Sequence, residues 1–501
     1  MAGTLSRRKL LALAGAGLSG LAAPARACRA SGRWDEAWDV IVVGSGAAGL
    51  SAAIMARKAG ASVLLIEKNR VLGGNTALCI GDMAVCGSPI QKKLGIRDSP
   101  EIMAADIRRY GVTSDFSRCL FVSHHSLAAW KWTVDELRMN WADNAVQFDV
   151  GQSRPRGIMM KPRTGASLIS AAVNRAEFLK VALRPGCRME SILRRRDRGA
   201  PAEGLCVSFE GGPLRRIQAR SGIVLAFGGF GADVRFREAL DPTLGSWVQT
   251  TNQLGATGES VTAAQKAGCA VVDMAQIQSL PFLCADEIGL GSAWSFIEYV
   301  TASRAIWVDD RGERFVNEQA GHSERSRKML ALARAGHRLY GIADQRAFDA
   351  PIPNFIGTKN WDEMVKRGIV RQYKTLSELC RDSDIPEKRL VHTIEVFNSF
   401  VRGAGGRDAF GRTLSGCRPL ATAPWYLVEI QAKVHHCMGG LRIRPGGEVL
   451  DVRGEVIPRL FAAGEATGGL FGRDRIPSHS LTDALTGGLS AGKKAAQARR
   501  L

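Results

Sequence analysis

Residues 39–67 read DVIVVGSGAAGLSAAIMARKAGASVLLIE, and this stretch decides the fold. The apolar run 39–43 predicts a short buried strand, and the Gly-rich segment 44–49 predicts a turn. Residues 50–59 predict a helix, and 63–66 predict a second apolar strand. A strand, a helix and a second strand in this order predict a βαβ unit with a right-handed crossover.

The turn Gly44-Ser45-Gly46-Ala47-Ala48-Gly49 has the spacing GxGxxG between a strand and a helix. Gly44 permits the tight turn, Gly46 lets the backbone approach a pyrophosphate, and Gly49 lets the helix pack closely on the strand. The free N–H groups of the helix N-terminus would then face the phosphates. Glu67 closes the second strand, where a carboxylate binds a ribose hydroxyl and repels a 2′-phosphate. The stretch therefore predicts a dinucleotide site that disfavours NADP.

The rest of the chain predicts an α/β protein whose nucleotide-binding domain is interrupted by a second domain. Its 501 residues suffice for two or three domains, and 45% hydrophobic with 23% charged residues is ordinary for a soluble globular protein. Strands at 222–226 and 460–463 and a helix after Leu481 share the style of the first βαβ unit. We expect nucleotide-binding segments at 28–274 and 436–501, separated by a cap and substrate domain at 275–435. Residues 99–141 predict helix, and 192–219 predict alternating strands.

The N-terminal residues 1–27 have the pattern of a twin-arginine (Tat) export signal. Arg7-Arg8 precedes a Gly/Ala/Leu-rich run, and Ala25-Arg26-Ala27 forms a small-x-small cleavage site. The run is too short and too Gly-rich to span a membrane, so we expect a periplasmic or otherwise exported protein without an integral membrane segment.

Cysteine spacing and charge exclude several function classes. The 11 cysteines form no CxxC or CxxCH motif, which argues against c-type haem and paired-cysteine zinc sites. His124-His125 has no acidic or cysteine partner at ligand spacing, so we predict no metal site. The net charge is +20, but the basic residues are spread along the chain, so we predict no nucleic-acid binding.

Six motifs, taken in order, carry a resemblance to a known family. They are IVVGSGAAGLSAA (41–53), IEKNRVLGGNT (66–76), VLAFGGF (224–230), GERFVNE (312–318), HHCMGG (435–440) and LFAAGEATGG (460–469). The chain after about residue 38 resembles the fumarate reductase/succinate dehydrogenase flavoprotein superfamily. The resemblance is strongest to soluble flavocytochrome c fumarate reductases, urocanate reductase and 3-ketosteroid dehydrogenases.

The resemblance implies a Rossmann-like, glutathione-reductase-type FAD-binding domain with an inserted α+β cap. It also implies non-covalent FAD, because the covalent members of the family carry a His where this chain reads Asn75-Thr76-Ala77. The implied FAD contacts, beside the glycines of the turn, are Ala48, Glu67, Asn75, Thr76, Gly81, Glu465, Ser480 and Leu481.

The family reduces a C=C bond beside a carboxylate or carbonyl, with hydride from flavin N5 to the β-carbon and a proton to the α-carbon. Fixed donors that stabilise the developing charge dominate such catalysis. His435 and Arg475 match the family positions that hold one substrate carboxylate, and an Arg can bind it with two parallel hydrogen bonds. The alternative for Arg475 is a surface ion pair with Asp474 or Asp483.

Other substrate positions depart from the family pattern. Leu280 replaces a His, and Ile297-Glu298 replaces Thr-Glu, so the cradle for a second carboxylate has become apolar. A doubly charged acid would be desolvated there without compensation. We expect a substrate other than fumarate, with one carboxylate or carbonyl and an apolar or aromatic remainder such as an aryl-acrylate. Leu280, Phe282, Trp294 and Phe296 are the expected apolar wall.

The proton donor also departs from the pattern. The family places a catalytic Arg or Tyr after the NE motif, where this chain has His322, and a His can act as a general acid near neutrality. Arg325 or Tyr299 are the alternatives. Glu298 keeps its place in the proton relay, but Thr301 matches the position of its partner Arg.

The sequence thus predicts an exported FAD-dependent enoate or enone reductase, with His322, Glu298, His435 and Arg475 as its catalytic residues. A separate redox partner such as a cytochrome c would supply electrons. The alternatives are an α,β-dehydrogenase that runs the same site backwards, and a non-catalytic flavin electron carrier.

Overall fold

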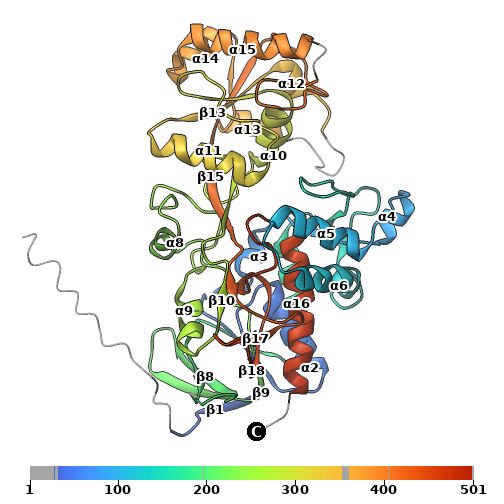
Figure 1. The fold of residues 1–501 in the computed structure, drawn as a ribbon, viewed down its shortest axis with the longest axis vertical. Coiled ribbons are helices and arrows are strands. Elements are labelled where there is room, and N and C mark those ends of the chain that lie inside the picture. Colours follow the sequence, from blue (N-terminus) through green and yellow to red (C-terminus); the bar gives the residue numbers. More distant parts are fainter. Residues whose placement is uncertain (1–27, 29–31, 196, 353–359, 404–405, 499–501) are drawn as a thin grey trace, which may run out of the picture.

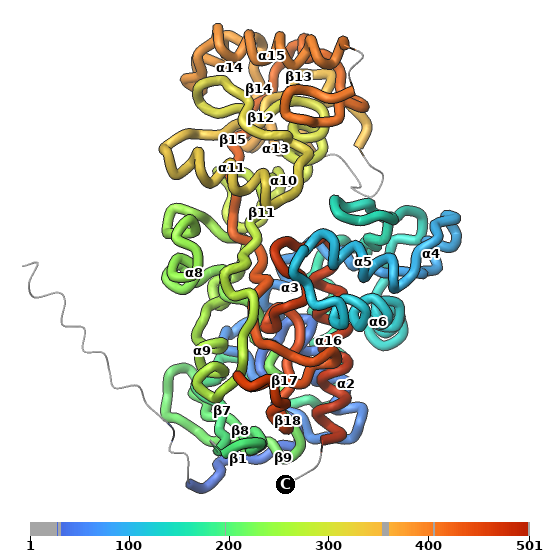
Figure 2. The backbone as a smooth tube through the Cα atoms, in the orientation of Figure 1, coloured from blue at the N-terminus to red at the C-terminus, as the bar shows by residue number. Residues whose placement is uncertain are grey.

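The computed structural model describes residue 28 and residues 32–195, 197–352, 360–403 and 406–498. The predicted export signal lies outside these residues. Figures 1 and 2 show three parts: a sheet-based body at the bottom, a cap at the top, and a smaller helical part at one side. No helix in the described parts of the chain is long and apolar enough to cross a membrane.

The body is built on an eight-stranded sheet with the order β17-β18-β9-β1-β2-β6, from which β7 and β8 branch. The five strands β18, β9, β1, β2 and β6 run parallel. The expected Rossmann-like α/β fold is confirmed. The strands of this sheet are β1 (Glu36–Val43), β2 (Val63–Glu67), β6 (Ala182–Pro185), β7 (Cys187–Arg194), β8 (Ala202–Phe209), β9 (Leu214–Leu225), β17 (Glu448–Leu450) and β18 (Val456–Ala462).

Strand β1 reads as a continuous apolar run because both of its faces are buried. Val40 and Val42 pack in a core with the helices on one side, whereas Ile41 and Val43 pack in a second core that includes β7 and β8. Parallel strands covered on both faces have this pattern. Each such side chain contributes about 1.5–3 kcal/mol by burial.

Helices α2, α7 and α16 cover the first of these two faces. Helix α2 follows the Gly-rich turn directly, and α16 lies against it (Figure 1). The helices of the body are α2 (Ala47–Lys58), α3 (Gly74–Leu78), α7 (Gly165–Phe178), α8 (Val234–Leu240), α9 (Glu259–Lys266) and α16 (His479–Gln497).

The second face carries an antiparallel meander of β7, β8 and β9. The expected separate strand at 222–226 is wrong, because β9 runs without a break from Leu214 to Leu225. Its first half pairs with β8 and its second half only with β1 and β18, so the residue pattern changes within one strand. A disulfide joins Cys28 to Cys206 of β8.

In the side part, the prediction of one helical segment at 99–141 needs correction. It holds two helices that are separated at Val112, whose φ of 62° ends the first one. Asp115 then caps the second helix by accepting a hydrogen bond from Ser117 N–H. The elements of this part are β3 (Asp82–Ala84), α4 (Pro89–Lys93), α5 (Pro100–Gly111), α6 (Phe116–Asp135), β4 (Asn140–Trp141) and β5 (Gly157–Lys161).

The cap has an antiparallel sheet in the order β11-β15-β13-β12, with β14 paired to β15, and helices around it. The expected α+β character is present. Its elements are β11 (Ile277–Cys284), α10 (Trp294–Phe296), the π-helical turn η1 (Ile297–Ala302), β12 (Ile306–Asp309), α11 (His322–Arg334), β13 (Leu339–Asp344), α12 (Gln345–Asp349), α13 (Trp361–Lys366), β14 (Arg371–Tyr373), α14 (Leu376–Ser383), α15 (Glu387–Arg402) and β15 (Trp425–Cys437).

Two long strands, β11 and β15, connect the cap to the body (Figure 2). The cap core draws on residues from Leu244 to Val434, and β15 continues to Cys437 beside the body. The short elements β10 (Val271–Val272), β16 (Gly440–Leu441) and the 3-10 turn η3 (Gly464–Ala466) follow at the junction. The domain limits expected at 274/275 and 435/436 stay a prediction.

Candidate active site

A cavity opens where the carboxyl ends of the parallel strands meet, which is where nucleotides bind in such sheets. Val43, Glu67, Ala226 and Ala463 bring the ends of β1, β2, β9 and β18 to its wall. Of the expected FAD contacts and motif glycines, Gly44, Gly46, Ala48, Glu67, Asn75, Thr76, Glu465, Ser480 and Leu481 line it. We call it the nucleotide cavity.

The glycines of the turn do what their spacing predicts. A Cβ at Gly44 would lie 2.3 Å from Ala226 O, and one at Gly49 would lie 1.9 Å from Gly44 O, so both positions require glycine for close packing. A Cβ at Gly46 meets nothing nearer than Thr76 Oγ1 at 3.4 Å. Gly46 therefore leaves room in the cavity itself, at the N-terminus of α2, as a phosphate site requires.

Glu67 and Thr76 organise the phosphate turn. Ser45 donates to Glu67 Oε2 from its backbone N–H at 3.1 Å and from its hydroxyl at 2.7 Å. Asn69 N–H donates to Glu67 Oε1 at 2.9 Å. Ala47 N–H donates to Thr76 Oγ1 at 3.1 Å. These bonds fix the carboxylate at the end of β2, where a ribose would be bound.

At the other end of the cavity, Glu465 accepts Cys437 N–H at 3.0 Å and Asn75 Nδ2–H at 3.3 Å. Burial raises the pKa of Glu465. Ser480 and Leu481 lie in the first turn of the 19-residue helix α16, whose N-terminus carries partial positive charge. The donors, glycines and acids of this cavity fit an FAD molecule.

A second cavity, here called the substrate cavity, lies between the body, the side part and the cap. It shares Asn75, Cys79, His435, Ser480 and Leu481 with the nucleotide cavity, so the two meet at these residues. Gly81, expected to contact FAD, lines the substrate cavity instead. All four expected catalytic residues, His322, Glu298, His435 and Arg475, line this cavity.

Arg475 is buried, with 4% of its surface exposed, and it has no ion-pair partner among the described residues. Its Nη1 donates to Ile476 O at 3.3 Å and to Ser480 Oγ at 3.4 Å, and its Nε has no hydrogen-bond partner. Asp483 pairs with Arg118 instead. The alternative of a surface ion pair is therefore wrong. A buried guanidinium with spare donors favours an anionic ligand.

The two histidines of β15 lie differently: His435 lines both cavities, whereas His436 lines the nucleotide cavity. His435 Nδ1 is 2.7 Å from Thr251 Oγ1, and part of its ring faces the cavities. Burial and the nearby Arg475 lower the pKa of His435 to about 3. His436 Nδ1 lies 3.5 Å from Glu465 Oε1 on the nucleotide side. Both imidazoles are held neutral.

His322 begins helix α11 and is 4% exposed. Its ring packs edge-on against Phe282, with 5.2 Å between the ring centroids, and its Nδ1 has no hydrogen-bond partner in the part of the chain that the structure describes. Burial, Arg325 and Arg475 lower the pKa of His322 well below its usual range. The imidazole therefore lies in the cavity and is neutral beside two cations.

Glu298 is held by Arg325, one turn along α11 from His322. Arg325 Nη1 and Nη2 donate to the two carboxylate oxygens at 2.7 and 3.1 Å. Thr301, the matched relay position, is fully buried and donates to Ile297 O instead. The cationic partner of Glu298, which is missing at position 301, is therefore Arg325 of helix α11. The only hint in the sequence is that Arg325 follows His322 by about one helical turn.

The apolar wall is partly as expected. Leu280, Phe282, Leu290 and Trp294 line the substrate cavity. The prediction that Phe296 belongs to this wall is wrong, because its side chain is fully buried in the cap core, with its ring centroid 5.8 Å from that of Trp361. Ile297 is buried in the same core. The side chains at 296 and 297 point away from the cavity because α10 and η1 turn them inward.

Sequence reasoning missed Asp149, which also lines the substrate cavity. It accepts hydrogen bonds from Ser478 Oγ at 2.7 Å, from Gln152 Nε2 at 3.3 Å and from Gln147. Burial raises its pKa to about 6, and Asp82 adds to the rise. Asp149 lies in a loop without a motif, so the sequence offered no signal for it.

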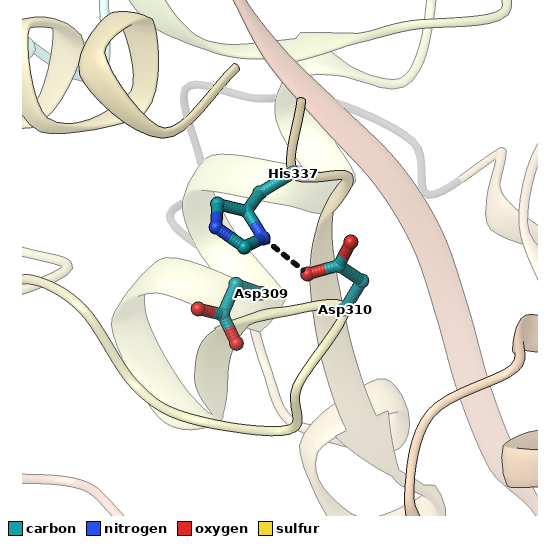
Figure 3. Close-up of side chains that lie close together, drawn as sticks. All are labelled: Asp309, Asp310 and His337. Carbon is teal, nitrogen blue, oxygen red and sulfur yellow. Dashed lines mark hydrogen bonds and ion pairs between the residues drawn. The ribbon is translucent and has the colours of Figure 1, made fainter. Parts of the chain in front are cut away.

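Asp309, Asp310 and His337 lie close together at the edge of the cap (Figure 3). Arg311 forms an ion pair with Asp309 at 2.6 Å, and His337 Nδ1 lies within hydrogen-bond distance of Asp310 at 2.8 Å, so these groups already have partners within the chain. They carry no argument for a bound metal. His124 is exposed on α6 and lies 3.4 Å from Glu101.

Comparison with known proteins places this geometry in a family. A family of FAD-binding domains matches residues 39–481. A fumarate reductase (cytochrome) from Shewanella frigidimarina is 33% identical over 468 residues, covering 92% of this chain and 77% of the relative. The acrylate reductase flavoprotein subunit of Shewanella woodyi is 30% identical over 512 residues, covering 99% of each chain.

Solved structures agree. The open conformation of a flavocytochrome c3 fumarate reductase matches with a TM-score of 0.78 and 25% identity, over 99% of this chain and 81% of that one. A 3-ketosteroid-Δ4-(5α)-dehydrogenase from Rhodococcus jostii matches with a TM-score of 0.72 and 25% identity, over 93% and 98%. The resemblance read from the sequence is confirmed. The chain belongs to the FAD-binding domain family, as an FAD-dependent oxidoreductase of the fumarate reductase type.

Proposed function

We propose that the protein reduces the C=C bond of an unsaturated monocarboxylate that carries an apolar, preferably aromatic, remainder. The observation that carries this proposal is Arg475. It is a buried guanidinium with spare donors, and it lines a cavity that meets the nucleotide cavity at His435. One substrate carboxylate placed on Arg475 and His435 would bring the adjacent C=C bond to this junction.

The opposite wall favours an apolar substrate tail. Leu280, Phe282 and Trp294 offer carbon surface, whereas the hydrocarbon side chain of Ile297 is buried in the cap core and does not reach the cavity. A second carboxylate on this wall would lose its hydration without a matching donor. Fumarate is therefore a poor fit, whereas the ring of an aryl-acrylate matches the wall.

The chain supplies orientation, charge and a proton to the reaction. Bound FAD would supply the hydride that reaches the β-carbon. Arg475 and the His435 ring stabilise the charge that develops on the carboxylate, which is where fixed donors matter most. His322, once protonated, donates the proton to the α-carbon, and Arg325 holds the Glu298 carboxylate, which lines the same cavity.

The compartment and the electron source complete the proposal. The twin-arginine pattern in residues 1–27 and the Cys28–Cys206 disulfide both support export to an oxidising compartment. The sequence has no CxxCH haem motif, so a separate redox partner such as a cytochrome c would deliver the electrons.

A viologen-linked reduction assay on the flavin-loaded protein tests the function. We expect cinnamate to reoxidise reduced methyl viologen faster than fumarate does. The rival α,β-dehydrogenase is favoured by the steroid dehydrogenase fold match, and it predicts that saturated ketones or acids bleach the oxidised flavin. A flavin spectrum that no unsaturated acid or ketone perturbs would support a non-catalytic electron carrier.

A further inference from the structure

Among the described residues, two buried nitrogen atoms without a hydrogen-bond partner belong to side chains that line the substrate cavity, namely Nδ1 of His322 and Nε of Arg475. Both side chains are 4% exposed. A buried polar group that is left unpaired destabilises a protein. Because both side chains line one cavity, a single bound ligand would lie beside both of them.

The titratable groups that surround His322 come from several elements. Helix α11 contributes Arg325, the segment before α16 contributes Arg475, and β15 contributes His435. Strand β11 contributes the uncharged ring of Phe282.

Two acids and a phenol complete the surroundings of His322. The carboxylate of Glu298, on η1, is already bound by Arg325. Asp474 accepts Ser323 N–H at 3.4 Å and Gln278 Nε2–H at 2.5 Å. Tyr110, from α5, lies near Asp474 and is uncharged near neutral pH because burial raises its pKa. Within the described residues, no carboxylate forms an ion pair with Arg475 or His322, so the protein's own groups favour a neutral imidazole.

We infer that His322 takes up a proton from solvent together with the substrate carboxylate, so that the site selects unsaturated acids over uncharged enones. This inference rests on the proposed function. A carboxylate on Arg475 adds one negative charge beside His322 and thereby favours the imidazolium. One anion and one proton enter together, so the buried net charge is unchanged.

The proton balance of the reaction then closes. The N–H bond of protonated His322 breaks as the α-C–H bond forms, and bound reduced FAD would supply the hydride for the β-carbon and the two electrons that reduce the C=C bond. His322 then returns to its neutral form. An amide or ketone of the same shape brings no charge, so it leaves His322 without the proton that the second half of the reaction needs.

Calorimetric titration of the oxidised, flavin-loaded protein tests this near neutral pH. Cinnamate is titrated in phosphate and in Tris, which differ in ionisation enthalpy, and the difference in measured heat gives the protons taken up. We expect about one proton per cinnamate bound, and about none per cinnamamide, since one group is titrating. In the viologen assay we expect cinnamate to exceed cinnamamide by at least about tenfold in kcat.

His322→Gln keeps a polar side chain of similar length and should bind cinnamate with about no proton uptake. His124→Gln, on the exposed face of α6, is the matched control and should keep the uptake of the unmodified protein. Cinnamate binding without proton uptake, or equal uptake by His322→Gln, would overturn the inference and leave the proposed function standing. No flavin perturbation by cinnamate, acrylate or fumarate would overturn both.

Discussion

Arg325 binds Glu298 through both oxygens of its carboxylate, at 2.7 and 3.1 Å, and so ties helix α11 to the π-helical turn η1 at the wall of the substrate cavity. The same guanidinium lies 5.7 Å from the centre of the Phe282 ring and 5.4 Å from that of Trp307. One side chain therefore joins the Glu298 carboxylate to the apolar wall and to the cap core.

Arg325→Ala should destabilise the protein markedly. Removing one partner of a buried pair leaves an uncompensated charge and costs about 3–5 kcal/mol, which we reduce to about 2–3 kcal/mol because Glu298 is 26% exposed. Urea unfolding at neutral pH measures the change. Arg338→Ala, which breaks the more exposed pair with Glu429, is the control and should cost about 0–1 kcal/mol. Equal losses in the two variants would show that the Arg325 pair is no more than a surface contact.

Arg475→Gln should lose turnover while the protein keeps its flavin. A missing donor to a developing oxyanion costs about 100- to 1000-fold in kcat. The viologen-linked assay measures turnover, and the absorbance ratio of flavin to protein measures cofactor content. Arg473→Gln, two residues away and exposed, should behave like the unmodified enzyme. Unchanged turnover in Arg475→Gln would move the carboxylate site elsewhere.

The two glycines of the phosphate turn should fail in different ways when each is changed to Ala. Gly46 has an ordinary φ of −70°, and a Cβ there has room within the protein, so Gly46→Ala should fold but lose FAD. Gly49→Ala should lower expression and thermal stability, because its Cβ would overlap Gly44 O. Flavin content and thermal unfolding separate the two outcomes, and a flavin-loaded Gly46→Ala protein would contradict the assigned phosphate site.

Acid should destabilise the fold through buried neutral histidines. The pKa values of His435 and His479 are lowered to about 3 by burial, against 6.5 for an ordinary histidine. As the pH falls from 6.5 toward 3, the unfolded chain binds protons that the folded chain does not, so the free energy of unfolding falls. Each such histidine contributes about 1.4 kcal/mol per pH unit. Asp149, whose pKa is raised to about 6, has the opposite effect, because the folded chain binds its proton before the unfolded chain does as the pH falls. It therefore offsets part of the loss due to one histidine.

The variant His479→Asn measures how much one histidine contributes to this loss of stability in acid. The slope of the unfolding free energy against pH below 6.5 should shrink by about 1.4 kcal/mol per unit, as measured by urea unfolding at several pH values. His392→Asn, on the exposed face of α15, should leave the slope unchanged. An unaltered slope in His479→Asn would mean that this histidine is protonated in the folded protein.

The sequence predicts those parts of the molecule in which the decisive contacts join residues that are close together in the chain. The GxGxxG turn works because Gly44 and Gly49 must pack within a few residues of each other, and that requirement is visible in the spacing. Glu67 is the last residue of β2, and its place at the end of an apolar run is equally visible in the sequence. The residues predicted to contact FAD line the nucleotide cavity, except Gly49, which packs on Gly44, and Gly81, which lies on the substrate side.

The substrate cavity was harder because its contacts come from distant elements. Nothing in the sequence pairs Arg325 with Glu298, and the direction of the Phe296 side chain depends on how α10 packs against α13. Asp149 gains its raised pKa only from the burial that the assembled loops create. Matching positions to a family pattern found the pocket, but not which side chains turn into it.

Strand β15 pairs with β13 at its start and carries His435 and His436 at its end. The strand therefore joins the core of the cap directly to the two imidazoles beside the nucleotide cavity. Because the cap sheet fixes the course of β15, we expect packing in the cap to set how a substrate carboxylate is aligned. Substitutions that loosen the cap end of β15, at Leu427 or Val428, should therefore weaken substrate binding although neither side chain lines the cavity.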